Sequence, residues 1–346
     1  MNPSIKHSDS PRRGVDPSGP EAAFHSRLLC PICRATLLLE GRTVRCEKNH
    51  SFDLAKEGYL NLLLSHQRKS KNPGDDKAMI QARRRFFDSG AYDPLTKLIL
   101  KKGLRPEASD LGDSTAPEPQ ASRLQPKAFP SILDCGCGEG HFLGALSEDP
   151  SISLRLGSPG GVAPPEESEP IGRASLSERT EYFFGVDISK EAIRCAAKRY
   201  KQATWIVANG MRELPLADHS MDVILSVLAP RNNEEFARIL KPKGHLILGV
   251  PGPNHLIELR SLLNATASDF EEKADEAAAK CEPLFTETAR DSVSYEMTLN
   301  REQITDLIQM TPIFWNSSPE AKRKIQQLDE LNITISFVLI LLRNAS

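Results

Sequence analysis

Short apolar runs, separated by longer segments with helical periodicity, recur through the second half of the chain. Runs of this length, bounded by polar and glycine-rich stretches, are typical of strands buried in a sheet. They comprise residues 132–134, 183–189, 204–207, 221–227 and 245–250. Helical patterns occupy two of the intervals, Glu191–Tyr200 and Glu234–Leu240, the second followed by a stop at residues 241–244. Strands that alternate with helices predict a doubly wound α/β sheet.

The C-terminal part adds two strands of a different kind. Val293–Leu299 predicts a sixth strand, and Asn332–Leu342 is a continuous apolar run, as expected for a last strand buried on both faces. Ser268–Glu282 is acidic and rich in alanine, which favours an exposed helix. We therefore expect a final hairpin-like pair of strands at the edge of the sheet.

The N-terminal half has shorter elements. Ala35–Arg45 predicts a hairpin that turns at Gly41. Met79–Phe87 predicts a helix that ends near Gly90, and a second helix begins close to Pro94, a residue favoured in the first turn.

Three segments lack either pattern. Residues 1–26 are polar and contain four prolines, so they predict a disordered tail. Residues 106–130 and 149–181 are rich in small residues, proline or acids and predict flexible inserts. The predicted organisation is then a tail, a small module at 27–63, a helical linker at 64–105, the first insert, and an α/β domain at 131–346 that carries the second insert.

Composition narrows the class of protein. The chain has 346 residues, 39% of them hydrophobic, and a formal net charge of −2, as is ordinary for a globular protein. No apolar run is long enough to span a membrane. Arg12 and Arg13 are not followed by the apolar segment of a secretory signal. The cysteine count is seven, an odd number, and we expect a reducing compartment, the cytoplasm.

Three of the cysteines and a histidine form a clustered pattern. Cys30, Cys33, Cys46 and His50 are spaced C-x2-C-x12-C-x3-H. Two tight turns that each present two ligands suit tetrahedral zinc, and a set closed by four protein ligands predicts a structural ion. So small a module also needs a metal to hold its fold. Chance placement of these residues is the alternative.

The linker is the most basic part of the chain. Residues 65–105 contain eleven Lys or Arg and four Asp, a net charge of +7. One interpretation is a surface that faces the phosphates of a nucleic acid. The other is a solvated helix face, in which Arg83, Arg84 and Arg85 brace the fold.

The glycine-rich stretch after the first strand carries the clearest chemical signal. Asp134, Gly136, Gly138 and Gly140 alternate with other residues, which predicts a buried strand, a tight turn and a helix start. Glycine allows both a sharp turn and a close approach of the backbone to a ligand. His141 stands where a dinucleotide-binding motif requires a third glycine. The spacing instead resembles the first motif of class I methyltransferases that use S-adenosylmethionine. An unrelated glycine-rich loop is the alternative.

Further motifs stand in order between the cysteines and this glycine loop. They are His50-x-Phe52-Asp53-x-Ala55-Lys56-x-Gly58-Tyr59-x-Asn61-Leu62-Leu63, Pro73-Gly74-Asp75, Ala82-Arg83-Arg84-x-Phe86 and Gly90-x-Tyr92-x-Pro94-Leu95. Together they closely resemble the bacterial 23S ribosomal RNA guanine-N1-methyltransferases, and Gln309–Trp315 again resembles that family. The two inserts are extra relative to it. The resemblance implies a Rossmann-like sheet of seven strands behind a zinc ribbon, with zinc and S-adenosylmethionine as cofactors.

Candidate residues for the methyl donor come from two sources. By resemblance, Tyr92, Gly138, Glu139 and His255 match positions that touch S-adenosylmethionine in the family. Asp134 and Gly136 belong to the glycine turn, and strand ends add two more residues, since polar groups there bind the ribose and adenine of a nucleotide-like ligand: Asp187 and Asn209. The alternatives are a core aromatic for Tyr92 and a surface-loop histidine for His255.

The reaction implied by the resemblance requires a base. Guanine N1 carries a proton, which must leave as the nitrogen attacks the methyl group. Asp93, Asp222 and His255 are candidates by location alone, so the catalytic base is left unassigned. N1 also lies on the Watson–Crick edge, so the guanine must be unpaired or flipped out of its stack. The resemblance implies that it lies in a hairpin loop of 23S ribosomal RNA.

Three hypotheses for function follow. The first is an rRNA guanine-N1-methyltransferase, which could act as a homodimer and would not bind a membrane. The second is a methyltransferase for a small molecule, since the segment from Ile132 to Val250 would suffice for that. The third is a zinc-ribbon RNA-binding protein without activity. The zinc module and the basic linker favour the first over the second, and the intact glycine turn with Asp187 argues against the third.

Overall fold

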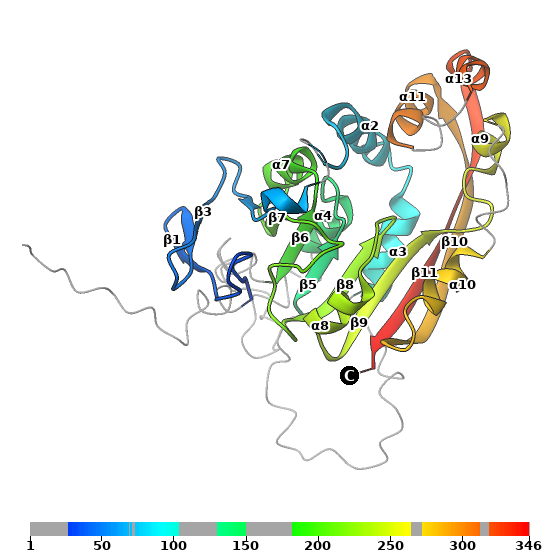
Figure 1. The fold of residues 1–346 in the computed structure, drawn as a ribbon. Coiled ribbons are helices and arrows are strands. Elements are labelled where there is room, and N and C mark those ends of the chain that lie inside the picture. Colours follow the sequence, from blue (N-terminus) through cyan, green and yellow to red (C-terminus); the bar gives the residue numbers. More distant parts are fainter. Residues whose placement is uncertain are drawn as a thin grey trace, which may run out of the picture.

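The computed structural model describes residues 27–68, 70, 73–103, 130–149, 182–263, 272–311 and 318–345. The predicted tail and nearly all of both predicted inserts lie outside these ranges. So do the first four residues of the predicted acidic helix and most of the segment 309–315. Within the described ranges the chain forms a small three-stranded sheet and a large eight-stranded sheet (Figure 1).

The large sheet is parallel in its centre, as predicted. Its strand order is β10-β11-β9-β8-β5-β6-β7-β4. The central strands are β5 (Ile132–Cys135), β6 (Phe183–Asp187), β7 (Thr204–Val207), β8 (Met221–Val227) and β9 (Leu240–Pro251). The chain runs from β5 outward through β6 to β7 and then returns to β8 on the other side of β5. The reversal makes the carboxyl end of β5 a topological switch point, where open α/β sheets bind ligands.

The sheet has one strand more than the seven that we expected. The additional strand, β4 (Leu60–Asn61), pairs in parallel with β7 at the edge of the sheet. The amide of Leu62 continues the pairing by donating to the carbonyl of Val207 at 3.0 Å. Two residues are too few for a periodicity to show in the sequence. Because β4 follows the metal-binding turns directly, it ties that part of the chain to the large sheet.

The predicted antiparallel edge is present. β10 (Phe285–Asn300) pairs with β11 (Glu330–Asn344), and β11 pairs antiparallel with β9. Both strands are longer than the runs that predicted them, because β10 alternates between more and less exposed residues rather than forming an apolar run. Two helices connect the pair: α11 (Arg301–Met310) and α13 (Pro319–Gln326).

The predicted helices are also present, within a few residues of the expected bounds. In chain order the helices before α11 are α2 (Lys77–Asp88), α3 (Asp93–Gly103), α4 (His141–Glu148), α7 (Lys190–Arg199), α8 (Asn233–Ile239), α9 (Ile257–Leu262) and α10 (Lys273–Ala279), and a 3-10 turn, η1, spans Ser65–Gln67. Side chains of Asp76, Ser189 and Asn232 cap α2, α7 and α8 at their N-termini. The predicted stop after α8 is instead the start of β9, because Leu240 already pairs with Met221.

Helices cover both faces of the large sheet, and the N-terminal module packs on one of these faces. One core packs α2, α3, α4, α7 and α9 against the sheet. The other contains α8, α10 and apolar side chains of the N-terminal module, among them Leu28, Leu37 and Val44. That module has three strands, β1 (Leu38–Glu40), β2 (Thr43–Arg45) and β3 (Ser51–Asp53), and the first two form the predicted hairpin. Its apolar side chains therefore share a core with the α/β domain.

Candidate functional site

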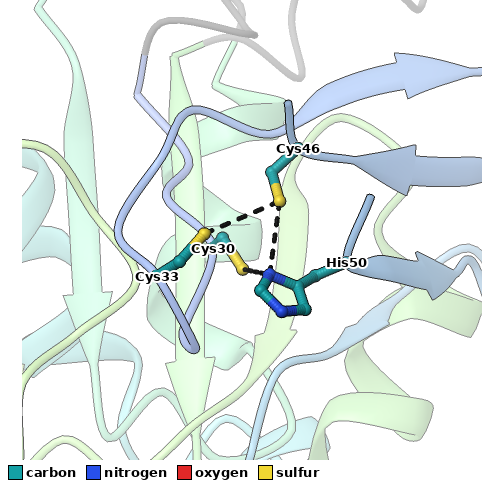
Figure 2. Close-up of side chains that lie close together, drawn as sticks. All are labelled: Cys30, Cys33, Cys46 and His50. Atoms are coloured by element: carbon teal, nitrogen blue, oxygen red, sulfur yellow. Dashed lines mark hydrogen bonds between the residues drawn. The ribbon is translucent and has the colours of Figure 1, made fainter. Parts of the chain in front are cut away.

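The four predicted metal ligands converge at one point of the N-terminal module. The ligand atoms of Cys30, Cys33, Cys46 and His50 all lie within 4.8 Å of one another (Figure 2). Cys30 and Cys33 come from the turn before β1, and Cys46 and His50 come from the turn between β2 and β3. Each turn contains a non-glycine residue in the left-handed region, Arg34 in the first and Asn49 in the second, which lets the ligands of each turn face each other.

The spacing of these atoms fits a tetrahedral zinc ion. The sulfurs of Cys33 and Cys46 are 3.7 Å apart, and Nδ1 of His50 lies 3.6 Å from the sulfur of Cys30 and 3.5 Å from that of Cys46. Bond lengths of about 2.3 Å to sulfur and 2.1 Å to nitrogen, at tetrahedral angles, place two sulfurs about 3.8 Å apart and a sulfur and a nitrogen about 3.6 Å apart. A disulfide would need sulfurs about 2.05 Å apart. The module therefore presents a closed Cys3His set.

The glycine turn adopts the conformation that its spacing predicts. Gly136, Gly138 and Gly140 all have positive φ, at 82°, 56° and 82°. A Cβ at Gly136 would lie 2.3 Å from Cβ of Ala229, and one at Gly140 would lie 2.5 Å from the ring of Trp205. The sequence pattern predicts glycine here for a sharp turn and for the close approach of a ligand. Side chains that pack against the turn already exclude a larger residue at both positions.

A cavity of about 570 Å³ opens beside the turn. It lies at the carboxyl ends of β5, β6 and β7, and its volume is typical of a pocket for a small molecule or cofactor. Its lining residues are Ser70, Pro73, Gly74, Cys135, Gly136, Val186, Asp187, Ile188, Asn209, Gly210, Met211, Arg212 and Pro230. Three of the predicted residues, Gly136, Asp187 and Asn209, thus share one cavity.

One wall of this cavity comes from the linker. The sequence did not predict that the linker would line a binding cavity. Pro73 and Gly74 form this wall together with Ser70. The hydroxyl of Ser189 donates to the carbonyl of Asp75 at 2.8 Å, and this bond holds the linker against the end of β6. The motif Pro73-Gly74-Asp75 was the only sequence signal for this wall.

Three carboxyl groups gather around the glycine turn, those of Asp134 and Glu139 buried and that of Asp187 partly buried. Asp134 is 1% exposed and Glu139 is 5% exposed, and among the described residues one carboxyl oxygen of Asp134 and both of Glu139 have no hydrogen-bond partner. Burial, reinforced by the neighbouring acids, raises the pKa of Asp134 to about 8. Burial raises the pKa of Glu139 to about 7, although Arg83 opposes the shift. Buried acceptors without donors are costly, so this region suits a ligand that is cationic or donates hydrogen bonds.

Asp187 and Asn209 also bond to the protein itself. The carboxylate of Asp187 accepts from the amides of Gly138 at 3.0 Å and Ser189 at 2.7 Å, so it fixes the turn as well as lining the cavity. Burial raises its pKa. The side-chain amide of Asn209 donates to the carbonyl of Gln67 at 3.2 Å, which makes it a second contact between the strand ends and the linker.

The basic residues of α2 mostly contact carboxylates within the chain. Arg83 forms an ion pair with Asp75 and lies 3.9 Å from Glu139. Arg85 forms a two-pronged ion pair with Asp306 of α11. Of the two interpretations of these arginines, the geometry at Arg83 and Arg85 therefore favours bracing of the fold. Arg84 is more exposed than Arg83 and lies 3.7 Å from Asp88 on its own helix.

Tyr92 and His255 lie together in a cluster of rings. Tyr92 is 2% exposed and packs edge-on against Phe337 and Phe86. His255 stacks on Phe337 at a centroid distance of 4.5 Å, and its Nδ1 accepts from the amide of Ser336. Burial lowers the pKa of His255 to about 3, so the ring is neutral. Neither residue lines the 570 Å³ cavity, and their predicted contact with the methyl donor stays a prediction.

The candidates for a catalytic base fall in different places. Asp222 lies near the amino end of β8, where it accepts from Lys241 and from the amide of Ser131. That position is at the opposite end of the strand from the cavity, so Asp222 is wrong as a candidate base. Asp93 is exposed at the start of α3. The neutral ring of His255 already uses Nδ1 as an acceptor.

Family models match two parts of the chain. The model described as "RlmA, N-terminal", a zinc ribbon, matches residues 28–71, and the model described as "Methyltransferase domain" matches residues 171–248. The first covers all four cysteine and histidine ligands, β4 and the start of the cavity wall. No helix among the described residues is long and apolar enough to cross a membrane.

Curated relatives match over most of the chain. The 23S rRNA (guanine(748)-N(1))-methyltransferase of Streptomyces fradiae is 30% identical over 90% of this chain and 95% of its own. A protein of Micromonospora griseorubida with the provisional name 23S rRNA (guanine-N(1)-)-methyltransferase is 30% identical over 84% of this chain and 88% of its own. YxjB of Bacillus subtilis, provisionally named in the same way, is 29% identical over 91% and 96%. This chain belongs to the family of 23S rRNA guanine-N1-methyltransferases.

Proposed function

We propose that the protein transfers a methyl group from S-adenosylmethionine to N1 of a guanine in a hairpin loop of 23S ribosomal RNA. One observation supports this most strongly. The donor-sized cavity at the carboxyl ends of β5, β6 and β7 has one wall built by the linker that follows the zinc module. A methyltransferase for small molecules has no need of such a connection, whereas an enzyme that docks on RNA through the module does.

Residues around the cavity suit the donor. S-adenosylmethionine supplies an activated methyl group on a sulfonium and also carries an ammonium group. The buried carboxyl groups of Asp134 and Glu139, which have oxygens without partners, would accept from or balance these cationic groups. Asp187, at the end of β6, would bond the ribose hydroxyls, and Asn209, at the end of β7, would face the adenine. Gly136 and Gly138 shape the turn beneath the donor.

Tyr92 and His255 would support this site through their ring cluster, outside the lining of the cavity. Their ring cluster joins α2, α3, β11 and the loop after β9. We propose that it fixes the position of the elements that carry the donor, and that a direct contact forms when the donor is bound. A neutral His255 offers Nε2 as a donor or an acceptor, depending on its tautomer.

The acceptor must present an unpaired edge. N1 of guanine is hidden in a base pair, so the enzyme requires a loop nucleotide or one turned out of its stack. The zinc set has four protein ligands and no open position, which makes its role structural. We propose that the module and the exposed cations of the linker dock on the RNA, and that the protein works where ribosomes are assembled, in the cytoplasm.

Primer extension on ribosomal RNA from cells with and without the gene tests this proposal. Methylation of N1 blocks base pairing, so reverse transcriptase is expected to stop one nucleotide before one guanine of the large-subunit RNA, only where the gene is present. Identical patterns of stops in the two RNAs would refute the assignment. Methyl transfer by the purified protein to an organic extract, but not to RNA, would favour the small-molecule alternative.

A further inference from the structure

The loop that follows β8, residues 228–232, is bordered by three hollows. Pro230 lines the 570 Å³ cavity and also a second hollow of about 450 Å³. Arg231 lines this second hollow and a third of about 490 Å³. Met211 lines both the first and the third. The shared lining residues make the three one continuous concave surface, which runs from the proposed donor cavity to α10.

Leu228 occupies this surface in a conformation that leucine rarely adopts. Its φ is +54°, in the left-handed region, and its amide donates to the carbonyl of Gly249 at 2.9 Å. The side chain is nevertheless 46% exposed, and Met211, which lines the first and third hollows, is 49% exposed. A large apolar side chain that is about half exposed gains only part of the free energy of burial, and the left-handed backbone adds a cost. Such strain is commonly kept where a ligand uses it.

Arg231 adds an unbalanced charge beside these apolar side chains. Its side chain is partly buried, and burial lowers its pKa. Within the described ranges, no carboxylate forms an ion pair with its guanidinium. Lys280, on the same surface, is by contrast paired with Glu276 at 3.1 Å. A partly desolvated guanidinium without an anion is costly unless a ligand provides the anion. Phosphate matches its fork geometry through two parallel hydrogen bonds.

We propose that this surface is the subsite for the acceptor nucleotide, with its base against Leu228 and Met211 and a backbone phosphate on Arg231. The proposal rests on the proposed function and specifies its substrate contacts. A nucleotide turned out of its stack has apolar faces on the base and an anionic backbone, and the surface offers the complement of both. It also lies next to the donor cavity, as transfer to an acceptor nitrogen requires.

The test compares four variants of the full-length protein on unmodified 23S rRNA transcribed in vitro. We expect Arg231→Ala to lower kcat/KM for the RNA about 10- to 100-fold, because a charge-assisted, two-pronged phosphate contact is lost. Leu228→Gly removes the side chain and keeps the positive φ without strain, which offsets part of the entropic cost of glycine. We expect it to lower kcat/KM several-fold. Calorimetry is expected to show unchanged affinity for S-adenosylmethionine in both.

Lys243→Gly is the matched control. Lys243 is also an exposed residue with positive φ, 63°, but it lies near the amino end of β9, away from the cavity. Its replacement removes a charge and a strained side chain, and kcat/KM is expected to stay within about twofold. The salt dependence of KM gives a second readout, which would not change if Arg231 only stabilised the fold. Loss of one phosphate contact reduces the slope of log KM against log salt concentration by about 0.7 to 0.9, and Arg231→Lys should retain the slope.

The outcomes separate this subsite from the proposed function. If the wild-type protein methylates the RNA and Arg231→Ala behaves like Lys243→Gly, the subsite is wrong and the proposed function stands. If Arg231→Ala loses affinity for S-adenosylmethionine or unfolds, Arg231 supports the fold, and the proposal is overturned as well. A wild-type protein that leaves 23S rRNA unmethylated would refute the proposed function and this inference with it.

Discussion

Replacement of Gly136 by alanine is expected to destabilise the protein and abolish binding of S-adenosylmethionine, for two separable reasons. The first is the backbone. At a φ of +82°, a residue with a Cβ pays roughly 1–2 kcal/mol that glycine does not. The second is space. The new Cβ would lie 2.3 Å from Cβ of Ala229, far inside the contact distance of about 3.5–4.0 Å between carbon atoms. Relief of such an overlap costs about 1–3 kcal/mol.

The sum, about 2–5 kcal/mol, can be divided by a second substitution. Ala229→Gly removes the atom that the new Cβ would meet, at a cost of its own of about 0.5–1 kcal/mol. The double variant Gly136→Ala/Ala229→Gly should therefore recover the overlap part and keep the backbone part. In a double-mutant cycle the coupling between the two sites is expected to be about 1–3 kcal/mol in favour of the double variant.

Urea denaturation of the four proteins measures the free energies of unfolding, and calorimetry measures affinity for S-adenosylmethionine. Donor binding should follow stability, absent in Gly136→Ala and partly restored in the double variant. A coupling near zero would mean that contact with Ala229 is not what requires glycine here. Undiminished donor affinity in Gly136→Ala would contradict the location of the donor over this turn.

Three further predictions concern the metal, the buried acids and α2. Protein purified without chelator is expected to contain one zinc per chain. Cys33→Ala should lose the zinc and also weaken donor binding, because the metal-binding turns lead into β4 and the cavity wall. Cys195→Ala, outside the cluster, is the control, and full donor affinity without zinc would count against this coupling. In the folded chain the carboxyl groups of Asp134 and Glu139 keep their protons up to about pH 8 and 7, whereas in the unfolded chain they lose them at much lower pH. The free energy of unfolding without donor should therefore fall as pH rises from about 5 to 8, by up to about 1.4 kcal/mol per pH unit for each group. The affinity for the cationic donor should rise between about pH 6 and 8 with release of protons. Glu139→Gln should reduce both dependences and leave the part that belongs to Asp134; a pH-independent affinity would exclude the two acids from the donor site. Arg83→Met should cost about 2–3 kcal/mol by leaving the carboxyl groups of Asp75 and Glu139 unpaired, whereas Arg84→Ala, in an exposed pair, should cost under about 0.5 kcal/mol. Denaturation curves that rank the two alike would contradict the interpretation that Arg83 braces the fold.

The sequence predicted those features that local pattern determines. The strands β5 to β9, the glycine turn and the Cys3His set all depend on runs or spacings of nearby residues, and each lies within a few residues of its predicted position. Asp187 and Asn209 were found because the carboxyl ends of neighbouring parallel strands meet at one edge of a sheet.

Features that depend on distant pairing left little trace in the sequence. Leu60–Asn61 becomes a strand only because an edge of β7 is open to it. The contact that excludes a Cβ at Gly136 comes from Ala229, on another strand end. Arg83 has an ordinary place in a basic helix, and only the fold puts it beside Asp75 and Glu139. Asp222 was proposed without regard to its place at the start of the run 221–227, which puts it at the amino end of the strand and away from the carboxyl ends, where such sheets bind ligands.

The central claim is that this chain methylates N1 of a guanine in 23S ribosomal RNA. Mass spectrometry of nucleosides tests it most directly. Unmodified 23S rRNA, incubated with the purified protein and S-adenosylmethionine labelled in the methyl group, is digested completely and analysed. The account predicts labelled 1-methylguanosine, approaching one residue per RNA molecule, and none with the Gly136→Ala variant. Label in another methylated nucleoside, or no label in RNA at all, would contradict it.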